Sequence, residues 1–164
     1  MGSLYVKGMT VHTLSGLDNL LSISGNLGIS ENQSLVSLEG LESLQSIGGY
    51  LDFQNNSGLS GINALQSLTS VGGNVFVSSS QLSHIEGLSS LQTVGGYLKL
   101  KDIPNLLKLE ALASLESVGG TLAIDNCSGL STLDGLSSLS EIGENLLIRD
   151  NGSLQHITGL SGLE

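Results

Sequence analysis

The sequence predicts an all-β solenoid in which short strands stack coil upon coil along one axis. Three observations support this fold class: a repeat of about 24 residues fills the chain, apolar residues recur at fixed places in each repeat, and glycine pairs recur beside them. A repeat of this length is too short for a long helix and a strand with their loops. We therefore expect little or no helix, and a core that continues from each coil into the next.

The repeat is defined by aligning the glycine pairs. Its shared pattern is approximately G-L-x-x-L-x-x-[IV]-G-G-x-L-x-[IVLF]-x-x-N-x-x-L-x-x-[LI]-x. The expected units are a partial coil 1–15, coils 16–39, 40–63, 64–86, 87–110, 111–134 and 135–158, and a partial coil 159–164. Residues 1–164 are thus expected to form a single repeat domain. Because both ends of the sequence fall inside the repeat pattern, we expect an excerpt of a longer array.

Two apolar columns, two residues apart, predict the main strand of each coil. They are Leu27, Leu51, Val75, Leu98, Leu122 and Leu146, followed by Ile29, Phe53, Val77, Leu100, Ile124 and Ile148. Because side chains alternate along a strand, both columns face the same side, which must be the interior. The preceding glycine pairs are expected at a corner where a side chain would collide or where φ must be positive.

A polar column is expected to point inward at the turn after this strand. It contains Asn32, Asn56, Ser80, Ile103, Cys127 and Asn151. Asparagine side chains can satisfy backbone groups that the corner leaves unpaired. Because Cys127 replaces asparagine here, we interpret it as a packed structural thiol rather than a nucleophile or a metal ligand.

The segments "LQSIGGYLDFQNNSGLSGINAL" and "LESVGGTLAIDNCSGLSTLDGL" resemble leucine-rich repeats, whose pattern is L-x-x-L-x-L-x-x-N/C-x-L. They are more similar still to the receptor L domain of insulin-receptor and epidermal-growth-factor-receptor relatives and of fungal and microbial cell-surface proteins. The glycine pair is a departure, because it places Leu51 four rather than three residues after Ile47. The resemblance implies a right-handed solenoid, an extracellular or cell-surface location, and binding through the strand face.

The outward positions of the main strands differ from the rest of the chain. They contain four of the five basic residues, all three tyrosines and Phe76, but only two of the fifteen acidic residues. The candidate ligand-binding residues are Tyr5, Lys7, Tyr50, Asp52, Phe76, Tyr97, Lys99, Lys101 and Arg149. Exposed aromatic residues beside charges are typical of recognition surfaces, so a protein or glycan ligand is expected. The alternative is that these side chains only stabilise cross-strand pairs.

Composition and motifs exclude several other classes of function. A net charge of −10 argues against binding to nucleic acid or to anionic membranes. No apolar run has the length of a membrane span, and no signal peptide is recognisable within these residues. The sequence has no G-x-S-x-G motif and no phosphate-binding loop before a helix, so we expect neither an enzyme nor a cofactor.

One acidic column is a weak candidate for a metal site. Glu86, Glu110 and Asp134 end consecutive repeats, and carboxylates about 4.8 Å apart repel one another unless a cation such as calcium screens them. The column is interrupted by Asn63 and Thr158 and is expected at an exposed corner. Solvated carboxylates are therefore the simpler interpretation, and no metal is expected.

Two alternative functions belong to other classes. Solenoid coils with open ends can pair end to end, so the chain could be a structural protein that self-associates into a filament or surface layer. Two hydroxyl ladders could instead order water and bind ice: Ser43, Ser67, Ser90, Ser114 and Ser138, and Ser22, Ser46, Ser70, Thr93 and Ser117. Small residues that keep this side of the coil narrow would give the same pattern.

Overall fold

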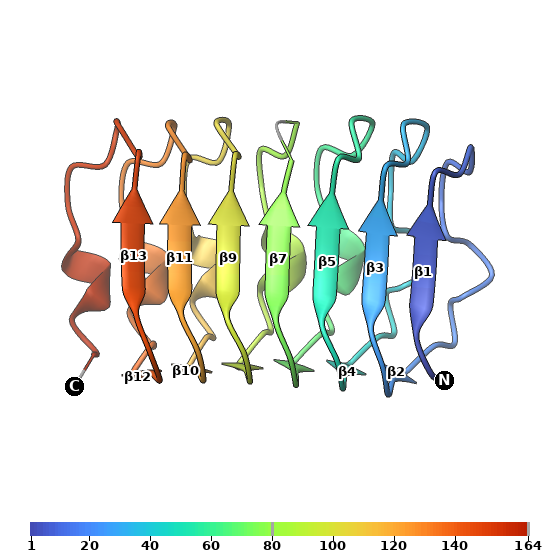
Figure 1. Cartoon of the computed structure of the whole chain (residues 1–164), viewed down its shortest axis with the longest axis horizontal. Coiled ribbons are helices and arrows are strands. Elements are labelled where there is room, and N and C mark those ends of the chain that lie inside the picture. The colour runs from blue at the N-terminus through green and yellow to red at the C-terminus, as the bar shows by residue number, and fades with distance from the viewer. Residues whose placement is uncertain (80, 164) are drawn as a thin grey trace.

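The computed structural model describes residues 1–79 and 81–163 and confirms an all-β solenoid of about six turns. In Figure 1 the long strands stand side by side at the front, and the chain returns behind them before each next strand. The front strands run upward while the chain advances from the N-terminus on the right to the C-terminus on the left. This combination makes the coil right-handed, as the family resemblance implied.

The main sheet contains seven parallel strands in chain order. They are β1 (Leu4–Lys7), β3 (Leu27–Ser30), β5 (Leu51–Gln54), β7 (Val75–Ser78), β9 (Leu98–Lys101), β11 (Leu122–Asp125) and β13 (Leu146–Arg149). Leu51 pairs in register with Leu27 on one side and with Val75 on the other. The register therefore confirms the predicted apolar columns.

A second sheet and a row of short helices complete each coil. The sheet consists of two-residue parallel strands, β2 (Ser22–Ile23), β4 (Ser46–Ile47), β6 (Ser70–Val71), β8 (Thr93–Val94), β10 (Ser117–Val118) and β12 (Glu141–Ile142). The helices are 3₁₀ turns, η1 (Asn63–Leu65), η2 (Glu86–Leu88), η3 (Glu110–Leu112), η4 (Asp134–Leu136) and η5 (Thr158–Leu160). No helix in the described ranges reaches seven residues, which confirms the expected scarcity of helix.

The apolar columns form one continuous core along the solenoid axis. Leu27, Leu51, Leu98 and Leu122 are completely buried, and the three-step columns behind them are buried as well. Fully burying one such side chain contributes about 1.5–3 kcal/mol, so the repeated columns are the main source of stability. The same columns open to solvent at the last coil, where Leu146 is 37% exposed.

The glycine pairs mark a corner where successive coils approach closely. A Cβ at Gly48 would meet the carbonyl oxygen of Ser24, and a Cβ at Gly72 would meet that of Gly48. Neither glycine has a positive φ, so collision is the constraint at this corner. Positive φ values occur instead at the corner after the main strand, at Gly8, Glu31, Asn55, Asp102, Asn126 and Asp150. Asn and Asp adopt this conformation more readily than most residues, which explains their frequency there.

The asparagine column points inward and binds the backbone of the preceding coil. Asn56 is buried, and its Oδ1 accepts hydrogen bonds from the backbone N and the Nδ2 of Asn32, both at 3.1 Å. The Nδ2 of Asn56 donates to the carbonyl oxygen of Ile29 at 2.8 Å. Asn151 repeats this arrangement with Cys127 and Ile124, each at 2.8 Å. The predicted member Ser80 lies outside the described residues.

Cys127 occupies an asparagine position with a similar contact. Its buried Sγ lies 4.0 Å from the carbonyl oxygen of Leu100, the counterpart of the Ile124 carbonyl that Asn151 binds. Burial raises the pKa of this thiol to about 11. The thiol is therefore packed and protonated at neutral pH, in agreement with the interpretation of a structural cysteine.

Removing the side chain of Asn56 should destabilise the whole solenoid. In Asn56→Ala, the backbone N–H of Asn32 and the carbonyl of Ile29 lose buried hydrogen bonds. Each unsatisfied group costs about 1–3 kcal/mol, so the free energy of unfolding in urea should fall by at least about 2 kcal/mol. The exposed Asn19→Ala is the control and should stay within about 0.5 kcal/mol of the wild type. Equal stability of the two variants would contradict the proposed role of the column.

Candidate recognition surface

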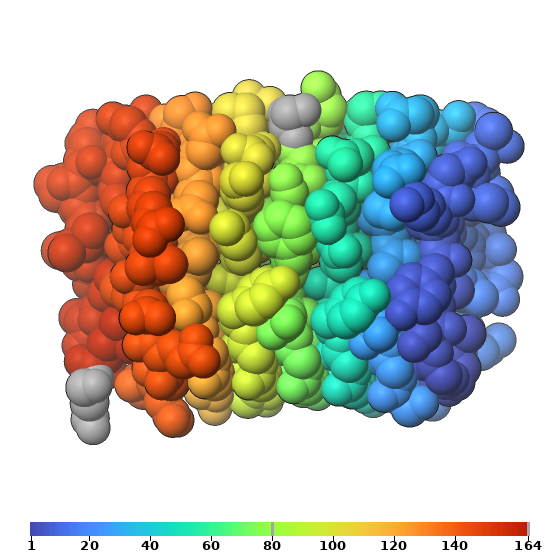
Figure 2. Space-filling model, viewed as in Figure 1, coloured from blue at the N-terminus to red at the C-terminus, as the bar shows by residue number. Residues whose placement is uncertain are grey.

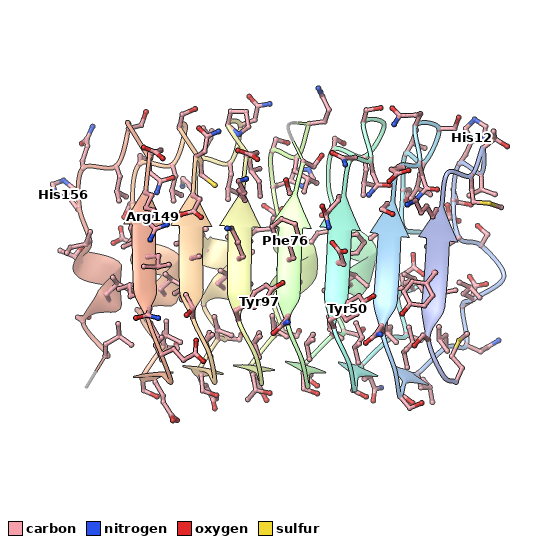
Figure 3. All side chains as sticks on the ribbon, in the orientation of Figure 1. His12, Tyr50, Phe76, Tyr97, Arg149 and His156 are labelled. Carbon is pink, nitrogen blue, oxygen red and sulfur yellow. The ribbon has the colours of Figure 1, made fainter. Side chains whose placement is uncertain are left out.

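The outward side chains of the main sheet, together with the residue before each strand, form the recognition face. Asp52, Phe76 and Lys99 are register neighbours in one row of this face. Figure 3 shows the side chains on this sheet, with Tyr50, Phe76 and Tyr97 labelled on three adjacent coils. The predicted residues all lie on this face: Tyr5, Lys7, Tyr50, Asp52, Phe76, Tyr97, Lys99, Lys101 and Arg149.

Two asparagines position the tyrosines of this face. The backbone N–H of Tyr50 donates to Oδ1 of Asn26 at 3.0 Å, and the backbone N–H of Tyr97 donates to Oδ1 of Asn74 at 3.1 Å. Asparagine and tyrosine thus alternate along one row, and each asparagine bonds the backbone of the tyrosine in the next coil. These bonds were not predicted from the sequence, although the repeats align Asn26, Tyr50, Asn74 and Tyr97 in one alternating column.

Tyr5 and Tyr50 are joined by their hydroxyl groups. The OH of Tyr50 donates to the OH of Tyr5 at 3.3 Å, and Nδ2 of Asn26 donates to the same Tyr5 oxygen at 2.9 Å. The ring of Tyr5 lies over Gly28, where an added Cβ would be only 2.8 Å from Cδ1 of the ring. The bond from Tyr50 lowers the pKa of Tyr5 because it stabilises the phenolate, and it raises the pKa of its donor, Tyr50.

A hollow of about 420 Å³ lies between Tyr50 and Tyr97 on the recognition face. Its lining consists of Tyr50, Leu51, Asp52, Gln54, Asn74, Phe76 and Tyr97. Nε2 of Gln54 donates to both carboxylate oxygens of Asp52, at 2.7 and 2.9 Å, and so fixes the orientation of this group. Figure 2 shows the recognition face in space-filling form, with each coil as a vertical band. The hollow combines aromatic planes with one oriented carboxylate.

The cations of the recognition face differ in their availability. Nζ of Lys99 lies 3.2 Å from Oδ2 of Asp125, whose side chain is only 13% exposed. Nζ of Lys101 lies 3.6 Å from Asp102, and both of these side chains are more exposed. Arg149 forms no ion pair with any described residue. Lys99 is therefore the counter-ion of a largely buried carboxylate, while Lys101 and Arg149 are more accessible from solvent.

The three candidate metal residues each begin a 3₁₀ helix, as the bounds of η2, η3 and η4 show. Each carboxylate has a partner of its own: His84 at 3.2 Å from Glu86, Lys108 at 3.2 Å from Glu110, and Thr158 at 3.1 Å from Asp134. Among the described residues, no group of three or more His, Cys, Asp and Glu side chains could hold a metal ion. The helix starts were not recognised in the sequence.

A larger hollow of about 490 Å³ runs along the second sheet. The hydroxyl ladder that begins at Ser22 lines this groove together with the corner glycines and small apolar residues, and Glu141 is the charged residue in the lining. In the other ladder, Oγ of Ser114 donates to the carbonyl oxygen of Ser89 at 2.8 Å. The first ladder therefore lines a groove, and one member of the second is bonded to the backbone.

The parallel coils, the leucine columns and the asparagine column define this protein as a leucine-rich-repeat solenoid. More particularly, the family model of the BspA type leucine-rich repeat region matches residues 28–152 in six copies, and the chain belongs to this family. No curated protein and no solved structure matches the chain. Solenoids of this class are typically non-enzymatic scaffolds that mediate protein interactions, generally in association with surfaces and adhesion. None of the helices in residues 1–79 and 81–163 could cross a membrane.

The linked phenols should titrate apart from each other. In the wild type, Tyr5 should ionise below the ordinary pKa of tyrosine and Tyr50 above it. In Tyr5→Phe the early ionisation should disappear, and the pKa of Tyr50 should fall because phenylalanine cannot accept its hydrogen bond. Phenolate absorbance measured across alkaline pH checks both changes, with Tyr97→Phe as the control. Retention of the early ionisation in Tyr5→Phe would show that the hydroxyl pair does not exist in solution.

Proposed function

We propose that this chain is a non-enzymatic binding module, located outside the cell or at its surface, that contacts a protein or a glycan through the recognition face. The supporting observation is the concentration on this face of four of the five basic residues, all three tyrosines and Phe76. The chain as a whole has a net charge of −10, so the recognition face is richer in basic residues than the rest of the chain. Membership of the BspA-type family supports the same class of function.

The face has the physical properties of a recognition surface. Tyrosine and arginine are enriched among the residues that dominate binding energy at interfaces. The sheet and the asparagine bonds hold the backbone of Tyr50 and Tyr97 in place, so little backbone entropy is lost on binding. Cross-strand stabilisation accounts for the contact between Tyr5 and Tyr50. Tyr97 differs, since it is 40% exposed and its hydroxyl bonds to no described residue.

The test compares two double variants on a microarray of purified extracellular proteins and glycans. Tyr97→Ala with Lys101→Ala removes an aromatic ring and a cation from the recognition face. We choose Lys101 rather than Lys99 because loss of Lys99 would leave Asp125 without its ion pair. Binding should weaken at least tenfold, which corresponds to about 1.4 kcal/mol.

The matched control is Leu107→Ala with Lys108→Ala. This pair also removes an exposed apolar side chain and an exposed cation, but it lies outside the main sheet. It should retain the wild-type partners, and both double variants should unfold at a temperature close to that of the wild type. Equal binding by both variants, or no partner for the wild type, would contradict the proposal.

Ice binding is not proposed. The hydroxyl ladder that begins at Ser22 lines a hollow together with corner glycines, isoleucines, valines and Glu141, so its hydroxyls do not form a surface of their own. In the other ladder, Oγ of Ser114 already donates to the carbonyl oxygen of Ser89.

A further inference from the structure

We infer that the hollow between Tyr50 and Tyr97 is a subsite for a neutral disaccharide of pyranose sugars. This inference rests on the proposed function, since it assigns a ligand class to one part of the recognition face. It follows from the spacing of the aromatic rings, the chemistry of the lining and the distribution of charge around the hollow.

The spacing of the two tyrosines suits a short, elongated ligand. Tyr50 and Tyr97 immediately precede β5 and β9, which flank β7 in the main sheet. Two strand spacings separate them, which is about 9.6 Å and close to the length of a disaccharide. Figure 3 shows both tyrosines at a similar height, with Phe76 on the strand between them. The backbone N–H groups of the two tyrosines bond to Asn26 and Asn74, which fixes the backbone positions from which the rings project.

The lining offers the two kinds of contact that a pyranose requires. The face of an aromatic ring is electronegative, and it attracts the C–H groups on the apolar side of a sugar ring. The carboxylate of Asp52 is a pure acceptor, with about four lone-pair positions on its two oxygens. Gln54 occupies one position on each oxygen, so acceptor capacity remains for sugar hydroxyls. Hydrogen bonds to a charged acceptor are stronger than those between neutral groups.

The charge around the hollow favours a neutral sugar over an acidic one. Asp52 is the charged residue of the lining, and the chain carries a net charge of −10. Lys99 lies beside Phe76 in the same row, but Asp125 already neutralises it. An acidic saccharide would therefore be repelled by the carboxylate of Asp52, and Lys99 is not free to offset that repulsion.

An extended peptide is a poorer match for the same position. Peptides commonly bind sheets by adding a strand at an unpaired edge. The strand beneath the hollow, β7, pairs with β5 on one side and with β9 on the other, so its backbone is not available. Recognition here must use side chains alone, and these are aromatic planes, amides and one carboxylate.

Saturation-transfer NMR with cellobiose, maltose and lactose tests the subsite. The hollow has a volume typical of a small-molecule site, but it is open to solvent on the outer face, so affinity for one disaccharide should be on the order of millimolar. At least one neutral disaccharide should receive saturation on its ring protons. The signal should fall at least tenfold for Tyr97→Ala and should also fall for Asp52→Asn, which loses the negative charge of the acceptor. Digalacturonic acid, an acidic disaccharide, should receive little saturation on its ring protons.

Leu107→Ala is the control, because it removes an exposed apolar side chain outside the main sheet and keeps all seven lining residues and their contacts. It should retain the transfer, and thermal unfolding should confirm that every variant is folded. Absence of transfer to all three neutral sugars, or equal transfer with Tyr97→Ala, would overturn the inference. Equal transfer to digalacturonic acid would overturn the neutral class.

The microarray separates failure of this inference from failure of the proposed function. Protein partners that are lost with Tyr97→Ala and Lys101→Ala, without any transfer to sugars, would reject the saccharide subsite and leave the recognition face intact. No array partner and no transfer to sugars would reject both proposals together.

Discussion

The parallel, in-register hydrogen bonding between successive coils is the constraint on which the rest of the structure depends. Because Leu27, Leu51 and Val75 pair directly, each residue type repeats at the strand spacing of about 4.8 Å. This spacing stacks the leucines into one core and brings the corner glycines against the carbonyls of the preceding coil. It also lets a buried asparagine reach the backbone of its neighbour. The recognition face is the other side of the same sheet, so its geometry is set by the same bonds.

The periodicity of the sequence predicted the coils because burial of the same positions in every coil imposes that periodicity. A position that faces the core in one coil faces it in every coil, so the same kind of side chain recurs there: apolar in the leucine columns and mostly asparagine in the corner column. The inward asparagines and the packed Cys127 could be predicted for the same reason. The periodicity of the sequence does not show which hydrogen bonds a column of polar residues forms. The helix starts at Glu86 and the positive φ of Asp102 therefore became visible only with the backbone in place.

The candidate site was predictable as a set of positions but not as a set of contacts. Alternation placed Lys99 and Lys101 on the outward side of one strand but did not distinguish them. The structure distinguishes them, because Lys99 pairs with the largely buried Asp125 while Lys101 pairs with the more exposed Asp102. Such a difference depends on side-chain rotamers across neighbouring coils, and a one-dimensional pattern does not contain them.

Pairing of the cations also changes what the recognition face can offer a ligand. Exposed ion pairs are worth little on their own, and a cation that is already neutralised adds little attraction for an anionic partner. Lys7, Lys99 and Lys101 all have carboxylates within 3.6 Å, whereas the ring of Tyr97 is left exposed. Under the proposed function, aromatic surface and oriented hydrogen-bonding groups are then the expected main sources of affinity on this face. Specificity should consequently follow the sizes of the outward residues, which vary from Gly28 to Phe76 along one row while the core beneath them stays constant.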